Sequence, residues 1–148
     1  MSAFVDSSAL VKLYADEEGH GPVRQLDAVV IAQIARVEVT AAFWRKQRVG
    51  EISGEDARLL TAEFEADYFG TDDEPPRFVA VRTTAGILDQ AARLCAVHGL
   101  RAYDGIQLSS GLAARHADPA CAQFATFDRS LRIAAAAESF SVLPHRGA

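Results

Sequence analysis

Four acidic residues of this chain lie beside or inside apolar segments, where charged side chains are unusual. Three stand at the end of an apolar run or at the start of a helical segment, and the fourth lies within an apolar helical segment. In chain order they are Asp6, Glu38, Asp104 and Asp128. A carboxylate near a core costs free energy unless a cation or hydrogen-bond donors meet it. Such oxygen ligands, without histidine or cysteine, suit a hard divalent cation such as Mg²⁺ or Mn²⁺.

Each acid also has an ordinary explanation when it is considered alone. An aspartate before a helix commonly caps the first turn, which would account for Asp6, Asp104 and Asp128. Glu38 has no capping role at its depth in the helix, and an ion pair with Arg36 or Arg101 is the alternative. Like charges gathered at one place repel and raise one another's pKa. A cluster of all four acids would therefore need a divalent cation.

Short apolar runs alternate with helical patterns along the chain and would position these acids. Strands are predicted at 3–5, 29–31, 78–81, 123–127 and 140–143. Helices are predicted at 7–14, 22–26, 36–48, 53–69, 84–98, 104–116 and 129–137. This alternation predicts an α/β fold, a three-layer α/β/α sandwich around a mainly parallel sheet of about five strands. Ligands of such sheets bind beyond the carboxyl ends of the strands, where Asp6 and Asp128 stand.

The helix at 36–48 is apolar around most of its circumference, so the sheet alone cannot cover it. It is predicted to pack against the helix at 53–69 as an antiparallel hairpin. The aromatic pair Phe43 and Trp44 is predicted to contact a second copy of the chain or another protein. Ordinary core packing of the two rings is the alternative.

The length of 148 residues fits one globular domain, 1–148, with a single core. The sequence shows neither an apolar stretch that could span a membrane nor a secretory signal, which predicts a cytoplasmic protein. The two cysteines, Cys95 and Cys121, are expected to be reduced thiols. The histidines lack the spacing of zinc ligands, so a zinc site is not expected.

The net charge of −5 argues superficially against a nucleic-acid partner. Most of that charge belongs to the four acids, however, and a bound cation would neutralise them. The remaining surface is then nearly balanced, and local basic groups can hold a phosphate backbone. The candidates for that role are Lys12, Arg36, Arg45, Arg101 and Arg129.

Four segments together resemble the successive motifs of PIN-domain ribonucleases, in particular the VapC-type toxins of type II toxin-antitoxin systems. They are residues 5–12, the helix around Glu38, residues 100–108 and residues 125–131. Each motif is short, but their order and spacing and the total length of the chain agree. The resemblance covers essentially the whole chain, and the segment 51–77 matches least.

This resemblance implies four catalytic, metal-binding acids and two supporting hydroxyls. The acids are Asp6, Glu38, Asp104 and Asp128, and the hydroxyls belong to Thr126 and Ser7. The resemblance also implies an Mg²⁺-dependent endoribonuclease, in which a metal-activated water hydrolyses an RNA phosphodiester. Asp6 and Asp104 are expected to be the central ligands, and Asp128 a weaker or second-metal ligand. A homodimer and a small VapB-like antitoxin are the implied protein partners.

Three other functions stay open from the sequence. A PIN-like nuclease could process RNA outside a toxin-antitoxin pair. An acid-pocket phosphatase or phosphotransfer receiver also places aspartates at strand ends, but such a phosphatase would have a second aspartate where this chain has Ser8. A non-catalytic binding module would use the surface around Phe43 and Trp44, although the retained acids argue against it.

Overall fold

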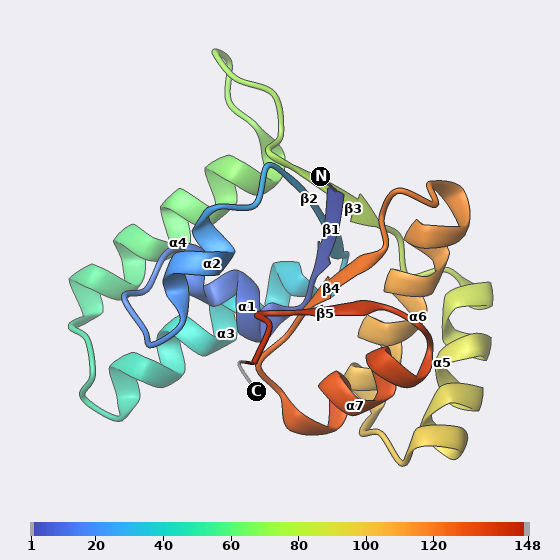
Figure 1. Ribbon diagram of the computed structural model, residues 1–148. Helices are drawn as coiled ribbons and strands as arrows, with labels where there is room; N and C mark the ends of the chain where they lie inside the picture. Colours follow the sequence, from blue (N-terminus) through green and yellow to red (C-terminus); the bar gives the residue numbers. More distant parts are fainter. Residues whose placement is uncertain (1, 147–148) are drawn as a thin grey trace.

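A parallel β-sheet forms the centre of the computed structural model, which describes residues 2–146 (Figure 1). Within these residues the sheet has five strands: β1 (Ser2–Val5), β2 (Ala28–Ala32), β3 (Phe78–Val81), β4 (Gln123–Ala125) and β5 (Ser141–Leu143). Their order is β3-β2-β1-β4-β5, and each neighbouring pair is parallel. The predicted strands are therefore confirmed, and the sheet is wholly parallel.

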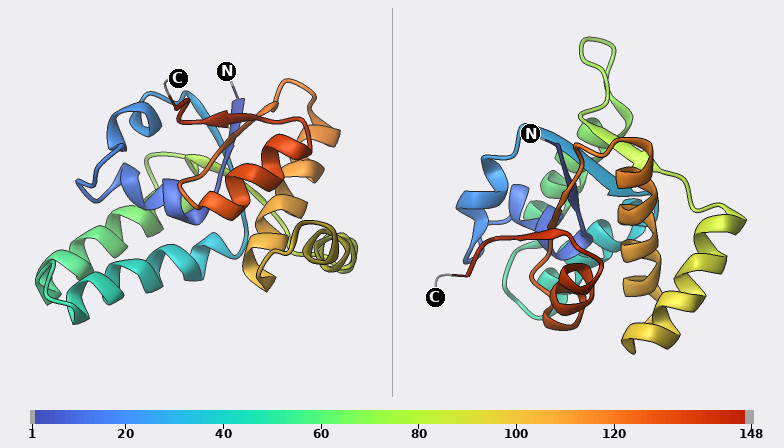
Figure 2. Two further views of the ribbon diagram at one scale, coloured as in Figure 1. Left: turned by 60° about the horizontal axis from the view of Figure 1, so that its bottom comes forward. Right: turned by 45° about the vertical axis from the view of Figure 1, so that its right-hand side comes forward.

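Helices cover both faces of this sheet (Figure 2). They are α1 (Ser7–Leu10), continued by the 3₁₀ turn η1 (Val11–Leu13), then α2 (His20–Arg24), α3 (Ala35–Arg48), α4 (Gly54–Phe69), α5 (Ala85–His98), α6 (Ala102–Ala117) and α7 (Arg129–Ala137). Alternate strand residues point to opposite faces. Val5 accordingly packs in a core with α1 to α4, and Phe4 packs in a second core with α5 to α7. The predicted three-layer sandwich is confirmed.

The strand order places a crevice beside β1. The chain leaves β1 toward β2 and β3, and returns to the other side of β1 only with β4. Helix α1 follows β1 on one face, and α7 follows β4 on the opposite face. Connections that diverge in this way open a crevice at the carboxyl ends of the two strands. Asp6 and Asp128 are the residues at this position.

Some element boundaries differ from the prediction. Strand β4 ends at Ala125 rather than at Phe127, because the Phe127 amide leaves the ladder and donates to Ser8 Oγ at 3.0 Å. Helix α6 begins at Ala102, so Asp104 lies in its first turn and does not precede it. Helix α2 begins at His20, ahead of the predicted start.

Gly105 sets the close approach of α6 to α5. A Cβ atom at this position would clash with Cys95 Sγ and would lie 3.1 Å from the Ala91 carbonyl oxygen, so a side chain here would force its neighbours on α5 to shift. Glycine therefore allows α6 to lie close to α5. This contact helps to set the position of Asp104, the preceding residue on α6.

Both cysteines are free thiols in the described chain: Cys121 is buried and Cys95 is partly exposed. Among the helices of residues 2–146, none combines the length and the apolar character that crossing a membrane requires.

Candidate functional site

Asp6 is the most buried acid of the site, with an exposed fraction of 3%. It caps α1 by accepting a hydrogen bond from the Ala9 amide at 3.0 Å, and it also accepts from Ser8 Oγ at 2.7 Å. Its other oxygen accepts from Thr126 Oγ1 at 2.5 Å. Burial raises the pKa of Asp6 to about 6, although these three hydrogen bonds act in the opposite direction. The capping explanation is thus correct for Asp6, but a cap does not require such burial.

Thr126 connects the acids that follow β1 and β4. Its buried hydroxyl donates to Asp6 and accepts from the Asp128 amide at 3.1 Å. Asp128 in turn caps α7 by accepting from the Leu131 amide at 2.9 Å. A hydroxyl can donate and accept at the same time, which an aliphatic side chain of similar shape cannot do. Thr126 therefore links Asp6, the residue after β1, to the segment after β4 that contains Asp128.

Asp104 adds a third acid from the first turn of α6. Its pKa is raised, first by burial and then by the negative charge of Asp128, while Arg101 acts in the opposite direction. The charge of Asp104 also helps to raise the pKa of Asp6. The three aspartates thus act on one another electrostatically, as expected for like charges gathered at one edge of the sheet.

The cation that meets these acids within the described chain is Arg101. Its Nε lies 3.3 Å from Asp104 Oδ2, and its Nη2 lies 3.3 Å from Asp128 Oδ2. A single guanidinium therefore bridges two of the three aspartates. The Arg101 side chain is 81% exposed, so this bridge lies at the mouth of the site.

Glu38 lies on α3, and its carboxylate accepts hydrogen bonds from two neutral donors. Its Oε1 accepts from Ser7 Oγ at 2.9 Å and from Gln107 Nε2 at 2.8 Å. The suggested ion pair with Arg36 or Arg101 is wrong, because Arg36 pairs with Glu65 on α4 and Arg101 pairs with the aspartates. Ser7, by contrast, donates to Glu38, and the role of its hydroxyl that the resemblance implies stays a prediction.

Gln107 is a site residue that the sequence analysis missed. It is 2% exposed, and its amide nitrogen donates to both Glu38 and Ser7. Its Oε1 is buried and accepts no hydrogen bond from any residue in 2–146. A buried acceptor without a donor costs free energy. The available signal was an amide inside the apolar segment that follows Asp104.

The donor set fits a hard divalent cation in its chemistry. Carboxylate oxygens, with hydroxyls behind them, are the ligands that Mg²⁺ and Mn²⁺ prefer. Within residues 2–146, however, no three acidic, histidine or cysteine side chains stand close enough to share one ion. Asp6, Asp104 and Asp128 are coupled by charge, whereas Glu38 belongs to a separate hydrogen-bonded group with Ser7 and Gln107. Metal binding by the four acids stays a prediction.

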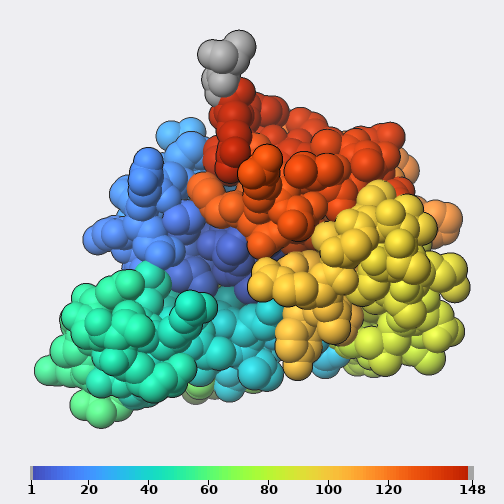
Figure 3. Space-filling view, turned by 90° about the horizontal axis from the view of Figure 1, so that it is seen from below, coloured from blue at the N-terminus to red at the C-terminus, as the bar shows by residue number. Residues whose placement is uncertain are grey.

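A groove of about 1020 Å³ begins beside Glu38 and runs along α3. Figure 3 looks onto this face from below and shows it hollowed between the α3–α4 hairpin and the segments that begin α6 and α7. Its lining includes Lys12, Val37, Arg45, Tyr103 and Phe127. Tyr103 is 62% exposed and Val37 is 70% exposed, so the groove offers apolar surface as well as charge.

The five basic candidates for phosphate binding fall into two groups. Lys12 and Arg36 are occupied within the fold: Lys12 Nζ donates to the Glu18 carbonyl at 2.7 Å, and Arg36 pairs with Glu65. Arg45 lines the groove, where it makes no ion pair with any described residue. Arg129 is exposed on α7, and Arg101 lies at the acids. Arg45 and Arg129 are therefore better placed to meet a phosphate, whereas Arg101 would first have to leave Asp104 and Asp128.

Phe43 does not form the predicted contact surface. Its side chain is fully buried, and the centroids of the Phe43 and Tyr14 rings lie 6.0 Å apart in an edge-on contact. The alternative of core packing is therefore correct for Phe43, while Trp44 is partly exposed on the same helix. A helix that is apolar around most of its circumference does not reveal which side the core covers.

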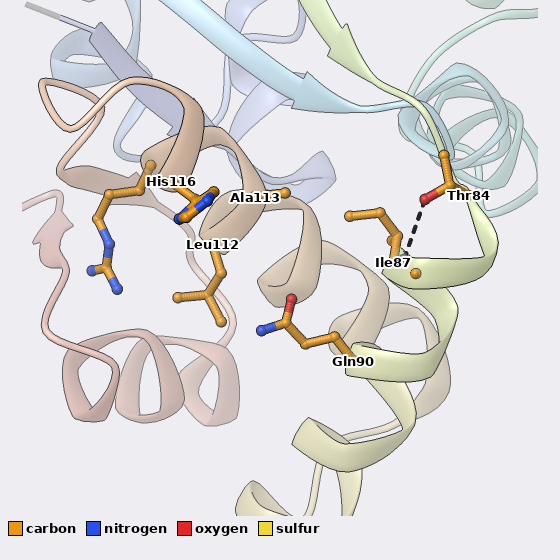
Figure 4. A pocket seen from close by; sticks show the side chains of 8 residues that line it. Thr84, Ile87, Gln90, Leu112, Ala113 and His116 are labelled. Atoms are coloured by element: carbon orange, nitrogen blue, oxygen red, sulfur yellow. Dashed lines mark hydrogen bonds between the residues drawn. The ribbon is translucent and has the colours of Figure 1, made fainter.

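A second cavity of about 560 Å³ lies between α5 and α6 (Figure 4). Gln90 and Ile87 on α5 line it opposite Leu112 and His116 on α6. Leu112 lies eight positions after Asp104 on α6, which is about 12 Å along the helix axis. This cavity is therefore separate from the acids.

Comparisons with known proteins agree with this fold. Two proteins of Mycobacterium tuberculosis strains, Ribonuclease VapC45 and Ribonuclease VapC49, are each 31% identical to this chain over 145 residues, which are 95% of this chain and 94% of theirs. FitAcB from Neisseria gonorrhoeae has a similar fold, with a TM-score of 0.59, 16% identity and 96% of each chain covered. PAE2754 from Pyrobaculum aerophilum matches with a TM-score of 0.56 and 18% identity, over 97% of this chain and 90% of that one. The family model described as "PIN domain" matches residues 3–137, and the chain therefore belongs to the PIN-domain family.

Proposed function

We propose that this chain is a metal-dependent endoribonuclease that acts as the toxin of a VapBC-type toxin-antitoxin pair. The observation that carries the proposal is the placement of three acids at the carboxyl ends of β1 and β4: Thr126 links Asp6 to the Asp128 segment, and Arg101 pairs with both Asp128 and Asp104. RNA is the proposed substrate because the relatives with 31% identity over nearly their whole length are named ribonucleases.

The four acids would bind a cation and orient a water. Asp6, Asp104 and Asp128 would hold Mg²⁺ or Mn²⁺, and Thr126 keeps Asp6 oriented through its hydrogen bond. A cation held there would supply a water of lowered pKa and would stabilise negative charge on the phosphate. Glu38, fixed by Ser7 and Gln107, would be a further ligand or would orient the attacking water.

The groove along α3 is the proposed path of the RNA. Arg45 would meet backbone phosphates, and the exposed ring of Tyr103 offers a face on which an unpaired base can stack. Tyr103 directly precedes Asp104, so a base stacked there would bring its phosphate to the acids. The groove therefore favours a single-stranded segment of RNA over a regular duplex.

Cleavage of a labelled RNA by the purified protein tests the activity. We expect Mg²⁺-dependent cleavage that EDTA abolishes, and a loss of about 100-fold or more in Asp6→Asn and Asp104→Asn. Asp89→Asn on α5 is the matched control, because Asp89 is exposed and outside the site. If Asp6→Asn and Asp104→Asn cleave RNA as fast as the wild type, the site assignment is wrong.

Expression in bacterial cells tests the toxin role. We expect the wild type, acting in the cytoplasm, to arrest growth and Asp104→Asn to have no effect. A small VapB-like antitoxin should restore growth and bind the proposed homodimer, whose mass is measurable by light scattering. RNA cleavage in vitro without growth arrest would instead favour an RNA-processing nuclease outside a toxin-antitoxin pair.

A further inference from the structure

Arg101 combines a fixed backbone with a loosely held side chain. Its carbonyl oxygen accepts from the Gly105 amide at 3.0 Å and lies 3.7 Å from Cys95 Sγ, which anchors the residue at the start of α6. Its side chain is 81% exposed, in contrast to 18% for Asp104 and 28% for Asp128. The aspartates are thus the more buried partners, and the guanidinium is the partner with room to move.

The ion pairs that hold the guanidinium are weak. Both contacts are 3.3 Å long, and they lie at the solvent-exposed mouth of the site. Exposed ion pairs contribute little because water screens them and the long side chain loses freedom. Even so, these contacts engage Asp104 Oδ2 and Asp128 Oδ2, the same kind of oxygen that a divalent cation would take.

We propose that Arg101 competes with the divalent cation for Asp104 and Asp128 and, once displaced, binds the phosphate of the RNA beside them. This inference rests on the proposed function, since it needs both a cation and an RNA at the site. A dication and a guanidinium repel each other, so each weakens the binding of the other to these carboxylates. The released guanidinium has five donors in a planar fork, which matches the oxygens of a phosphate.

Calorimetric titration with Mn²⁺ tests the competition. We expect Arg101→Gln to bind Mn²⁺ about 3-fold to 30-fold more tightly than the wild type, which corresponds to about 0.6–2 kcal/mol. Arg93→Gln is the matched control. It removes the same charge from an exposed position on α5, and Arg93 makes no ion pair within the described residues. Its Mn²⁺ affinity should change by less than about twofold, because screened surface charges act weakly at a distance.

Binding of RNA tests the second half of the proposal. The probe is a fluorescent single-stranded 12-nucleotide RNA, measured by anisotropy with Ca²⁺ in place of Mg²⁺. Loss of one phosphate contact should reduce the slope of log affinity against log salt concentration by about 0.7 in Arg101→Gln. Arg101→Lys keeps a cation and should keep most of that slope. Arg93→Gln on α5 should leave it unchanged.

The outcomes separate this inference from the proposed function. Equal Mn²⁺ affinity in the wild type and Arg101→Gln would overturn the competition while leaving the metal site in place. An unchanged salt slope in Arg101→Gln would overturn the phosphate contact. Absence of Mn²⁺ binding in both proteins would overturn the metal site itself and, with it, the competition.

Discussion

Replacement of Asp6 by asparagine should stabilise the metal-free protein at neutral pH. Burial raises the pKa of Asp6 from 3.8 to about 6, so the folded state resists ionisation of this carboxyl group. One pKa unit corresponds to about 1.4 kcal/mol, and the ionised group therefore costs about 3 kcal/mol at pH 7. The asparagine side chain would carry no charge and would remove this cost, although it cannot reproduce all hydrogen bonds of the carboxylate.

The pH dependence of stability separates the effect of the Asp6 charge from the effect of its hydrogen bonds. Because the folded pKa of Asp6 is raised, the protonated group is favourable below about pH 4, and this stability is lost as the pH rises toward 6. The stability difference between Asp6→Asn and the wild type should therefore grow by about 2–3 kcal/mol from pH 4 to pH 7. For a chain of this size, about 3 kcal/mol corresponds to about 6–12 °C in Tm.

Urea denaturation in EDTA at several pH values measures this difference. Asp89→Asn controls for the loss of one negative charge, because Asp89 lies exposed on α5. The reasoning is wrong if the Asp6→Asn difference is the same at pH 4 and pH 7. A stabilised Asp6→Asn protein that no longer cleaves RNA would also show that lost activity does not come from unfolding.

Three further predictions concern the metal, the amide and the core. Mn²⁺ at about 100 times its dissociation constant should stabilise the wild type by about 2.7 kcal/mol in a thermal shift assay and stabilise Asp6→Asn much less; an equal shift would place the ion elsewhere. Gln107→Leu should lose about 1–3 kcal/mol of stability and reduce RNA cleavage, because Glu38 loses a buried donor; full activity would show that Glu38 needs no such support. Phe43→Ala should lose about 3–5 kcal/mol in urea denaturation, whereas Leu59→Ala at an exposed position should stay within about 0.5 kcal/mol; similar losses would contradict the burial of Phe43.

Local patterns in the sequence were sufficient to predict the sheet and the placement of Asp6 and Asp128. The apolar run before each acid predicted a strand, and a parallel sheet collects the carboxyl ends of its strands at one edge. The structure confirms these strands and the three layers. The end of β4 was predicted two residues too late, because the Phe127 amide donates to Ser8, which is 119 positions away in the chain.

Contacts between distant segments could not be predicted from local sequence patterns. Gln107 reaches Glu38 across 69 positions, and no local pattern indicates that pairing. Arg101 could have paired with several acids, and the sequence did not show that its partners would be Asp104 and Asp128. The orientation of Phe43 was open for a related reason, because its helix has apolar residues on nearly every side.

The hydrogen bond from Thr126 to Asp6 also bears on the synthesis of the protein. It joins residues that are 120 positions apart, and Asp128 follows Thr126. A ribosome makes the chain from its N-terminus, so a growing chain carries Asp6 long before the last acid exists. A partly synthesised chain therefore lacks the complete site. If the chain is the nuclease proposed above, it cannot cut RNA before the ribosome has made Asp128.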